Sequence, residues 1–349
     1  MTFTIRRRNF LAAGAVLGAG LVLPHASRAQ DKTLVAATFP GTWSEAHREI
    51  LAPAFRKRAS AAITQSIILA HDQVSRLMAA KGGRAPFDVA IFDSPQVLDA
   101  VKQGLIVRYP KAKSPNFPKL LPQYQNEWGP VISMQVIGIG YNPNRVKTPP
   151  RSWDELFDRK YKGRVGLTAL NSQLGIAFLA ELNRIKGGNE SDFEPGFKAL
   201  RELLPNVGAI GVNLGAYATL WQQEQIDIAP YNFNFVATLK GKGVPVALTI
   251  PATGAVGWHT SLHLCAGAAE PGLAVQYIDS HLDAAVQTEM MAAPYNVIPT
   301  NSQVRLAGAI TQSIGKTHDE LAKIRGVDWE KLNPQRGALI ERFNREIRI

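Results

Sequence analysis

Residues 33–58, TLVAATFPGTWSEAHREILAPAFRKR, contain a complete unit of strand, loop and helix. The apolar run at residues 33–38 predicts a short strand, and the loop Phe39-Pro-Gly-Thr-Trp43 ends it with turn-forming residues. Ser44 is predicted to cap a helix over residues 45–58, because apolar side chains recur there at helical spacing. The segment therefore predicts one α/β unit whose loop lies at the carboxyl end of a strand.

A second unit of the same kind follows along the chain. Residues 87–92, FDVAIF, predict a buried strand after a helix-like stretch at residues 74–80. Asp93-Ser-Pro then leads into a helical stretch at residues 96–103. Such alternation is typical of α/β sheets with parallel strands, and ligands bind outside the carboxyl ends of those strands. We therefore expect the loop after residue 38 and Asp93-Ser94 on one rim of the sheet.

Two long apolar segments are candidates for strands that cross between lobes. They are VISMQVIGIGYN at residues 131–142 and AVGWHTSLHLCAGA at residues 255–268, and each exceeds an average strand. Between them lies material for a second α/β lobe, with helices predicted at residues 152–157, 172–186 and 214–224 and strands at residues 164–167 and 226–229. The sequence thus predicts a two-lobed α/β fold, each lobe a sheet flanked by helices, joined by hinge strands.

The predicted domain boundaries follow from these patterns. Lobe 1 is expected to comprise residues 31–133 and 259–306, and lobe 2 residues 134–258. Residues 307–349 are expected to form C-terminal helices, clearest at residues 319–325 and 334–347, that pack on lobe 2 or on the hinge. A mature chain of about 320 residues is large for a single hydrophobic core, which also favours two domains.

The first 30 residues have the three parts of an export signal. A basic start precedes an apolar run at residues 10–23, and Ser27-Arg28-Ala29 offers a cleavage site. The run is shorter than the roughly 20 residues that a membrane-spanning helix needs. Residues 7–11, RRNFL, fit the twin-arginine pattern, with an ordinary Sec signal as the alternative. We expect export to the periplasm and removal of this segment.

Charge and cysteine content exclude several classes of function. The formal charge of +11 falls by four to +7 without the signal, and the remaining excess is spread along the chain. That distribution favours attraction of anions over nucleic-acid binding. Cys265 is the only cysteine, which excludes an intramolecular disulfide and a thiolate metal cage. We expect no metal, no cofactor and no nucleic-acid partner, and a monomer.

Several stretches, taken in their order along the chain, form a recognisable set of motifs. They are Gly41-Thr-Trp43, residues 84–93 (RAPFDVAIFD), Gly104-Leu105, residues 137–142 (IGIGYN), residues 150–156 (PRSWDEL) with 162–164 (KGR), and residues 251–254 (PATG) leading to Trp258. Together they resemble the periplasmic solute-binding proteins of ABC importers, in particular the spermidine/putrescine-binding group, and the resemblance covers residues 33–305. It implies two lobes that close over one small molecule, delivery to a membrane permease, and no catalysed reaction.

The sequence departs from this family pattern in its acids. Thr253 stands where the pattern reads Pro-x-Glu-Gly, Thr260 replaces the acid two positions after Trp258, and residues 170–174 read LNSQL. Asp93 alone remains as a matched carboxylate. Because a buried ammonium needs counter-charges, a polyamine would be poorly held. The departures favour an anionic or zwitterionic solute, such as a carboxylate, aminophosphonate or sulfonate, and leave a polyamine-like solute open.

The candidate ligand-binding residues are mostly neutral hydrogen-bonding groups, with Trp43 and Trp258 as apolar walls. Helix starts near Ser44 and Ser172 offer backbone N–H groups to an acidic group. The alternative is that Asp93, Asn171 and Ser172 cap helices and that Tyr231 packs in its lobe. The full set is Thr42, Trp43, Ser44, Asp93, Ser94, Asn171, Ser172, Tyr231, Asn232, Thr253, Trp258 and Thr260.

Two other functions on the same two-lobed fold stay open. An exported hydrolase needs an activated nucleophile, but the chain has no Gly-x-Ser-x-Gly motif. A metal-ion-binding protein needs clustered ligands, whereas His259 and His263 lie in a predicted strand without a nearby carboxylate. Neither function has a local motif in its favour.

Overall fold

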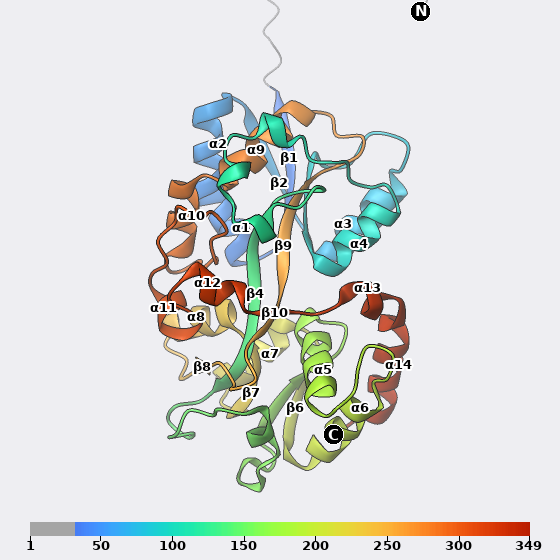
Figure 1. The fold of residues 1–349 in the computed structure, drawn as a ribbon, viewed down its shortest axis with the longest axis vertical. Helices are drawn as coiled ribbons and strands as arrows, with labels where there is room; N and C mark the ends of the chain where they lie inside the picture. The colour runs from blue at the N-terminus through green and yellow to red at the C-terminus, as the bar shows by residue number, and fades with distance from the viewer. Residues whose placement is uncertain (1–31) are drawn as a thin grey trace, which may run out of the picture. The chain divides into compact units, whose positions relative to one another are not determined.

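The computed structural model describes residues 32–349, and the predicted export signal lies outside this described range. Ten strands of the described chain form one mixed sheet with the order β2-β1-β3-β9-β4-β7-β5-β6, extended by β10 beside β9 and β8 beside β4. Helices gather around the two ends of this sheet, and Figure 1 shows β4 and β9 running between the two groups. We call the end built on β1, β2 and β3 lobe 1, and the end built on β5, β6 and β7 lobe 2.

Lobe 1 begins with the strand, loop and helix unit of residues 33–58. One continuous helical segment follows the loop. It consists of α1 (Thr42–Ala46), a π-helical stretch (His47–Leu51) and α2 (Ala52–Ala59). At the N-cap, Gly41 has a φ of 78°, a conformation that favours glycine, and the helix begins at Thr42. The prediction that Ser44 caps the helix is wrong, because its hydroxyl lies inside the first turn and donates to the Gly41 carbonyl at 2.8 Å.

Parallel pairing of β1 with β2 and β3 confirms the predicted parallel strands of this lobe. Buried side chains of these strands and of the returning helix α9, including Leu34, Ile91 and Ile278, share one core. The elements are β1 (Thr33–Thr38), α1 (Thr42–Ala46), α2 (Ala52–Ala59), β2 (Ala62–Ile67), α3 (Ala70–Ala79), β3 (Val89–Asp93), α4 (Ser94–Lys102), α9 (Pro271–His281) and α10 (Ala284–Met291).

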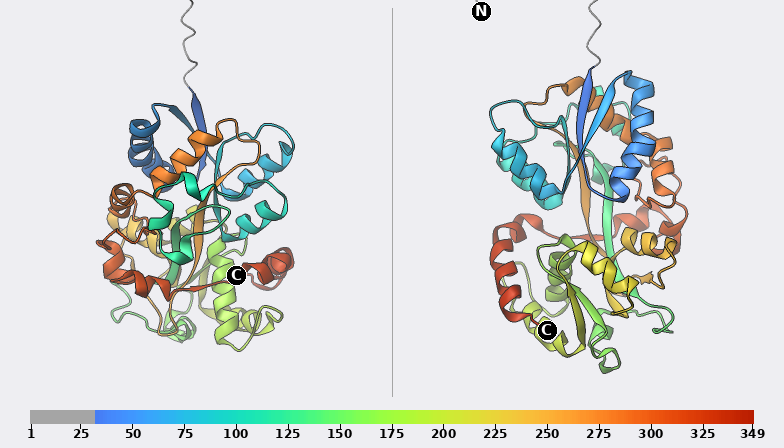
Figure 2. Two further views of the ribbon diagram at one scale, coloured as in Figure 1. Left: turned by 45° about the horizontal axis from the view of Figure 1, so that its top comes forward. Right: turned by 180° about the vertical axis from the view of Figure 1, so that it is seen from behind.

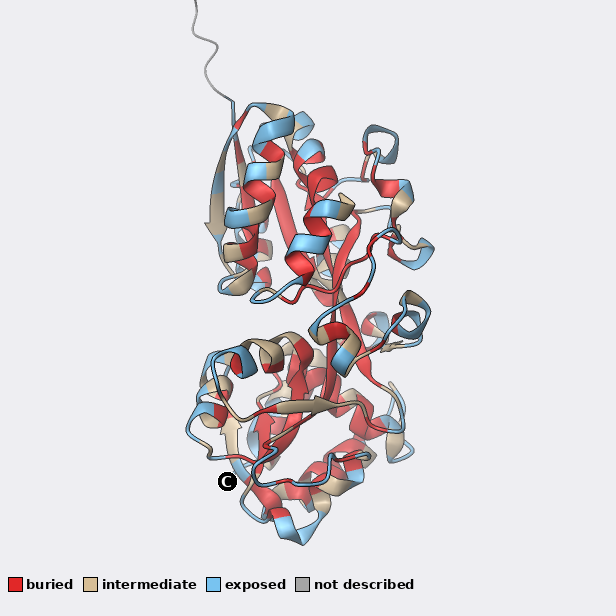
Figure 3. Ribbon diagram, turned by 90° about the vertical axis from the view of Figure 1, so that its left-hand side faces the viewer, coloured by how far each residue is buried: buried red, intermediate tan, exposed pale blue. Residues whose placement is uncertain are grey.

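Two long antiparallel strands join the lobes, as the sequence predicts. They are β4 (Val131–Tyr141) and β9 (Val256–Leu264), and nearly all of their residues are buried. β9 pairs with β3 on one side and with β4 on the other, while β4 continues to β7. Figure 3 shows the buried residues continuing along these strands from one lobe to the other.

Lobe 2 is a second α/β layer in which β5 pairs in parallel with β6 and β7. Its core includes the large side chains Trp153, Tyr217 and Trp221. The predicted helix at residues 152–157 is a 3₁₀ turn, Trp153–Phe157, opened by a capping box between Ser152 and Glu155. The elements are β5 (Val165–Thr168), α5 (Gln173–Ile185), α6 (Glu194–Leu203), β6 (Val207–Gly211), α7 (Leu214–Gln222), β7 (Ile228–Asn232), α8 (Phe233–Gly241) and β8 (Ala247–Thr249).

The C-terminal segment returns from lobe 1 across the hinge strands. Figures 1 and 2 show it ending as α14 beside α5 and α6, where Leu339 and Phe343 enter the core of lobe 2. The prediction of helix through residue 325 is wrong, because Arg325 pairs with Val256 as a strand. The elements are α11 (Ala309–Ser313), α12 (His318–Ala322), β10 (Arg325–Gly326), α13 (Trp329–Leu332) and α14 (Arg336–Glu346).

None of the helices in residues 32–349 combines the length and the apolar character that a membrane crossing requires.

The exact lobe boundaries in the sequence stay a prediction.

Candidate ligand-binding site

Asp93 ends β3 and lies opposite Thr260 of β9, so their side chains share one face of the sheet. The Thr260 hydroxyl donates to the Asp93 carboxylate at 2.8 Å. Asp93 holds the N-cap position of α4, but its side chain makes no capping hydrogen bond. Trp258, two residues before Thr260, lies on the same face of β9, opposite Gln135 of β4. The hinge strands therefore bring Asp93, Trp258 and Thr260 together.

The environment of Asp93 opposes its charge. Desolvation raises the pKa of this carboxyl to about 6, while the Thr260 hydroxyl, the Trp258 indole and the charge of Arg336 act in the other direction. The Trp258 residue is only 5 % exposed, and its indole N–H, which meets no other hydrogen-bond partner, acts on this carboxylate. Asp93 is thus ionised at neutral pH and accepts one hydrogen bond, from Thr260.

Ser94 has a different role. Its hydroxyl accepts from the His259 backbone N–H at 3.1 Å and donates to the His259 carbonyl at 3.3 Å. These bonds fix the start of α4 to β9. The Ser94 side chain therefore positions Asp93 and is not free for a solute.

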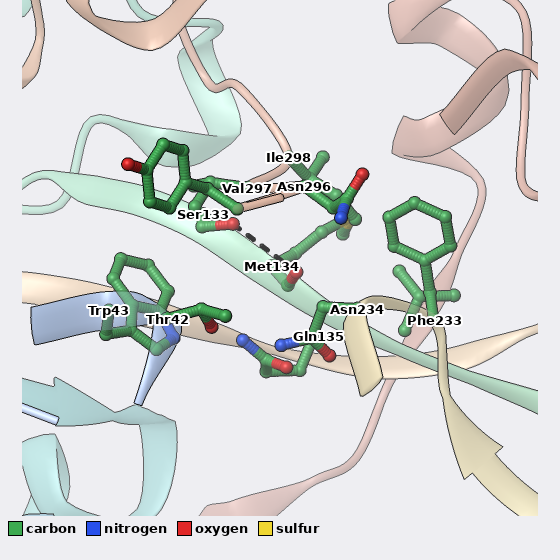
Figure 4. Close-up of a pocket in the computed structure, with 12 residues that line it drawn as sticks. Thr42, Trp43, Ser133, Met134, Gln135, Phe233, Asn234, Asn296, Val297 and Ile298 are labelled. Carbon is green, nitrogen blue, oxygen red and sulfur yellow. Dashed lines mark hydrogen bonds between the residues drawn. The ribbon is translucent and has the colours of Figure 1, made fainter. Parts of the chain in front are cut away.

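Two further predicted residues, Thr42 and Trp43, lie across the interlobe space from lobe 2. Thr42 and Trp43, from the start of α1, face Phe233 and Asn234, from the start of α8, and Gln135 of β4 lies between them (Figure 4). The enclosed volume is about 10 Å³, close to the space of one water molecule. In this arrangement a solute could enter only if the walls moved apart.

Asn171 and Ser172 lie at the start of α5, on the lobe 2 side. Ser172 caps the helix by accepting from the Gly175 N–H at 3.0 Å, and the Asn171 amide donates to the Val212 carbonyl at 3.2 Å. The next residue, Gln173, donates to Gln96 of α4 at 3.1 Å. The amino-terminal ends of α4 and α5 therefore meet at the junction of the two lobes.

Four of the predicted residues lie away from these groups or are packed differently. Ser44 is buried against Gly41, and Tyr231 is fully buried between Trp221 and Phe235, with ring centroids 5.6 and 6.0 Å away. Asn232 is 1 % exposed at the N-cap of α8, and its Oδ1 has no partner.

Thr253 is exposed on the turn before β9. Its hydroxyl approaches Glu181 of α5 at 3.5 Å, and its carbonyl accepts from Arg325. These contacts belong to a separate charged cluster in lobe 2. The structure therefore does not bring Thr253 to Asp93 or Trp43.

Sequence reasoning missed Gln135, Asn234, Gln96 and Arg336. Gln135 interrupts an apolar strand, and that interruption is a usable signal for a polar site. Arg336 lies more than 240 residues from Asp93 and has no local signal. It reaches the start of α5, where its Nη2 donates to the Asn171 carbonyl at 3.2 Å.

Among residues 32–349, no group of three or more His, Cys, Asp and Glu side chains could hold a metal ion. The His263 ring bonds through Nδ1 to the Trp128 carbonyl at 2.9 Å, and His259 packs edge-on against Tyr124. Burial lowers the pKa of both histidines, which keeps them neutral at neutral pH.

Comparison with known proteins gives a consistent result. The profile of a family described as "Bacterial extracellular solute-binding protein" matches residues 85–333. The spermidine/putrescine-binding periplasmic protein of Escherichia coli (strain K12) is 26 % identical over 278 residues, covering 75 % of each chain. The γ-aminobutyric acid-binding protein of Pseudomonas aeruginosa is 22 % identical over 245 residues, covering 67 % of this chain and 68 % of the relative.

The fold also matches solved structures. A crystal structure of an ABC transporter protein from Clostridium perfringens ATCC 13124 superimposes with a TM-score of 0.76 at 19 % identity, over 90 % of this chain and all of that one. At such low identity the match establishes the two-lobed α/β fold and nothing about the solute.

Proposed function

The chain belongs to the family of bacterial extracellular solute-binding proteins, and from that premise we propose that its solute is a small molecule with an acidic group and an amine. It is the solute-binding component of an ABC transporter and catalyses no reaction.

One observation carries the choice of solute. Asp93 is the only carboxylate among the predicted binding residues, and its neighbours Thr260 and Trp258 are neutral. A single carboxylate balances one ammonium group, whereas a di- or triamine brings two or three into a desolvated site. A solute with one amine and one acidic group therefore fits the charge of the site better than a polyamine.

The relatives support this reading without deciding it. The named solutes of the two curated relatives, polyamines and γ-aminobutyric acid, share an amine on a short aliphatic chain. Asp93 suits that amine in both cases. The second end of the solute distinguishes the two classes, because putrescine carries a further ammonium and γ-aminobutyrate carries a carboxylate.

Binding would proceed by closure of the lobes around the hinge strands. Thr42, Trp43 and Asp93 lie in lobe 1, whereas Asn171 and Asn234 lie in lobe 2. A solute that contacts both groups stabilises the closed state by its differential affinity for that state. The membrane permease would recognise the closed shape. We propose residues near 133 and 259 as the boundaries between the lobes.

Export and delivery complete the proposal. The E. coli relative is named as a periplasmic protein, and residues 1–30 of this chain are predicted to be an export signal. The protein would thus act as a monomer in the periplasm, with an inner-membrane permease as its partner. Whether the twin-arginine or the Sec pathway exports it would follow from replacing Arg7 and Arg8 by lysine, which blocks only the former.

Thermal unfolding with a panel of solutes tests the proposed function. The panel compares γ-aminobutyrate, taurine and 2-aminoethylphosphonate with putrescine and spermidine. A solute at 100 times its Kd stabilises the folded state by about 2.7 kcal/mol, so binding appears as a higher midpoint. We expect a shift with at least one acid-bearing solute and none with the polyamines. Shifts with the polyamines alone would refute the proposal.

A further inference from the structure

The C-terminal segment forms hydrogen bonds with the amino-terminal ends of α4 and α5, which meet at the junction of the lobes. The Asn333 amide donates to the Pro95 carbonyl in the first turn of α4 at 2.9 Å, and the Arg336 guanidinium donates to the Asn171 carbonyl before α5 at 3.2 Å. The segment thus touches lobe 1 and lobe 2 within one helical turn. Arg336 lies between the two, at the amino-terminal end of α14.

Arg336 differs from other arginines that are partly removed from solvent in this chain. Arg325 pairs with Glu181 at 3.1 Å, and Arg164 pairs with Asp227 at 2.7 Å through both carboxylate oxygens. Within residues 32–349, no carboxylate lies within ion-pair distance of Arg336. Its one hydrogen bond uses Nη2, so most of its five N–H donors have no partner in the described chain.

The surroundings of Arg336 strengthen this contrast. Desolvation lowers the pKa of its guanidinium, while Asp99 and Asp93 act in the opposite direction from a distance. A charged group that is partly desolvated is stabilised when an opposite charge binds it directly. An acidic group of a solute would provide that charge and would accept from the fork of N–H donors in the geometry that guanidinium favours.

Two features describe the two ends of this junction. The first is the amino-terminal end of α5, a helix of 13 residues, whose dipole favours negative charge beside Asn171 and Arg336. The second is Asp93, which accepts one hydrogen bond, from Thr260, and has no cation within ion-pair distance in the described chain, while the Trp258 indole acts on it. One end of the junction thus offers unused donors and a cation, and the other offers a carboxylate without a bound cation.

From this arrangement we infer that Arg336 binds the acidic group of the solute and is the residue that selects acid-bearing solutes over polyamines, while Asp93 binds the amine. The inference rests on the proposed function and adds the residue that would decide the solute class. A cation at this position repels the second ammonium of a diamine and attracts a carboxylate, phosphonate or sulfonate.

Calorimetric titration of three variants tests the inference. Arg336→Gln removes the charge, Arg336→Lys keeps the charge but loses the bidentate fork, and Arg345→Gln is the control. Arg345 carries the same charge on the same helix, about 13 Å further along α14, and pairs with Glu346. The probes are γ-aminobutyrate and putrescine, which share a four-carbon chain and one amine. Taurine and 2-aminoethylphosphonate extend the test to other acidic groups.

We expect Arg336→Gln to weaken binding of the acid-bearing probe by about 10- to 100-fold, the range of a lost charge-assisted hydrogen bond. Putrescine, for which we expect no binding to the wild type, should either remain without binding or gain it, because a like charge has been removed. Arg336→Lys should lie between, and Arg345→Gln should match the wild type. A purely structural role would change the midpoint of unfolding without changing the affinity for the acid-bearing probe.

The outcomes separate the two proposals. In one outcome, the wild type binds an acid-bearing probe and Arg336→Gln weakens this binding no more than Arg345→Gln does. That outcome would overturn the role of Arg336 and leave the proposed function in place. Polyamine binding by the wild type, without binding of any acid-bearing probe, would overturn the proposed function and this inference together. If Arg336→Gln failed to fold, the affinities of Arg336→Lys for the same two probes would decide.

Discussion

Two carboxylates near the interlobe region have opposite surroundings, and the difference separates a structural acid from a binding acid. Glu181, in the middle of α5, is buried and accepts from Arg184 through both oxygens at 3.0 Å and from Arg325 at 3.1 Å. Asp93 accepts one hydrogen bond, from Thr260, and no cation of the described chain lies within ion-pair distance. Glu181 is satisfied by its own chain, whereas Asp93 is not.

The two acids act on different parts of the molecule. Glu181 connects α5 with the C-terminal strand β10 and with the turn that carries Thr253, so its bonds hold elements of one lobe and the hinge together. Asp93 lies where the lobes meet and has capacity for a further donor. A partly buried carboxylate that has no bound cation is costly to the fold and useful to a ligand.

Glu181→Gln should give the largest effect on stability. Removing one partner of a fully buried ion pair costs about 3–5 kcal/mol, and we expect about 2–3 kcal/mol here because both arginines keep contact with solvent. Denaturant unfolding would show the loss as a lower midpoint at unchanged slope. The affinity for γ-aminobutyrate should stay the same, and putrescine should remain without binding. A change in either result would contradict the structural role of Glu181.

Asp93→Asn should give the reverse pattern. Loss of the only matched carboxylate should weaken binding of an amine-bearing solute by about 10-fold or more, because a charged hydrogen bond becomes a neutral one. Unfolding at pH 7 should be unchanged or shifted to higher denaturant, since desolvation opposes the charge of the carboxylate, as its raised pKa shows, and Asn carries no charge. Lower stability with unchanged affinity would place Asp93 with Glu181 as a structural acid.

The pH dependence of binding sharpens the comparison further. Because the pKa of Asp93 is raised to about 6, the carboxylate that binds the amine is ionised above that pH and protonated below it. Affinity for γ-aminobutyrate should therefore fall by about 10-fold between pH 7.5 and pH 5. Arg336, the charged group that acts on Asp93, does not titrate in this range. Asp93→Asn should abolish the pH effect, and an equal effect in that variant would assign it to another group.

Thr253→Ala should give the smallest effect. Its hydroxyl lies at 3.5 Å from Glu181, on an exposed turn, and the stronger bonds of Glu181 to its two arginines would remain. We expect less than about 0.5 kcal/mol in the free energy of unfolding and no measurable change in affinity. A clear loss of affinity would show that Thr253 reaches the solute in a state other than the one described.

The backbone could be predicted further than the site. β1 covers the predicted residues 33–38, and β4 and β9 are the two predicted hinge strands, because their patterns are continuous along the chain. The resemblance to solute-binding proteins is confirmed by the match over residues 85–333. Hydrophobic pattern and motif order are local signals, and they were sufficient for the fold.

The placement of side chains depends on contacts that the sequence pattern does not contain. Ser44 follows a glycine that begins the helix earlier than predicted, and Tyr231 shares its burial with Trp221, whose proximity arises only on folding. Arg336 reaches the junction because α14 packs on lobe 2 through side chains such as Leu339 and Phe343. The roles of the predicted binding residues stay predictions.

The most direct measurement is a calorimetric titration of the wild-type protein at pH 7.5 with spermidine and γ-aminobutyrate side by side. A site with one carboxylate and one unpaired guanidinium should bind γ-aminobutyrate with a defined Kd and give no saturable heat with spermidine. Tight binding of spermidine, with no binding of the amino acid, would contradict the account and would mean that Asp93 and acids outside the described groups suffice for a polyamine.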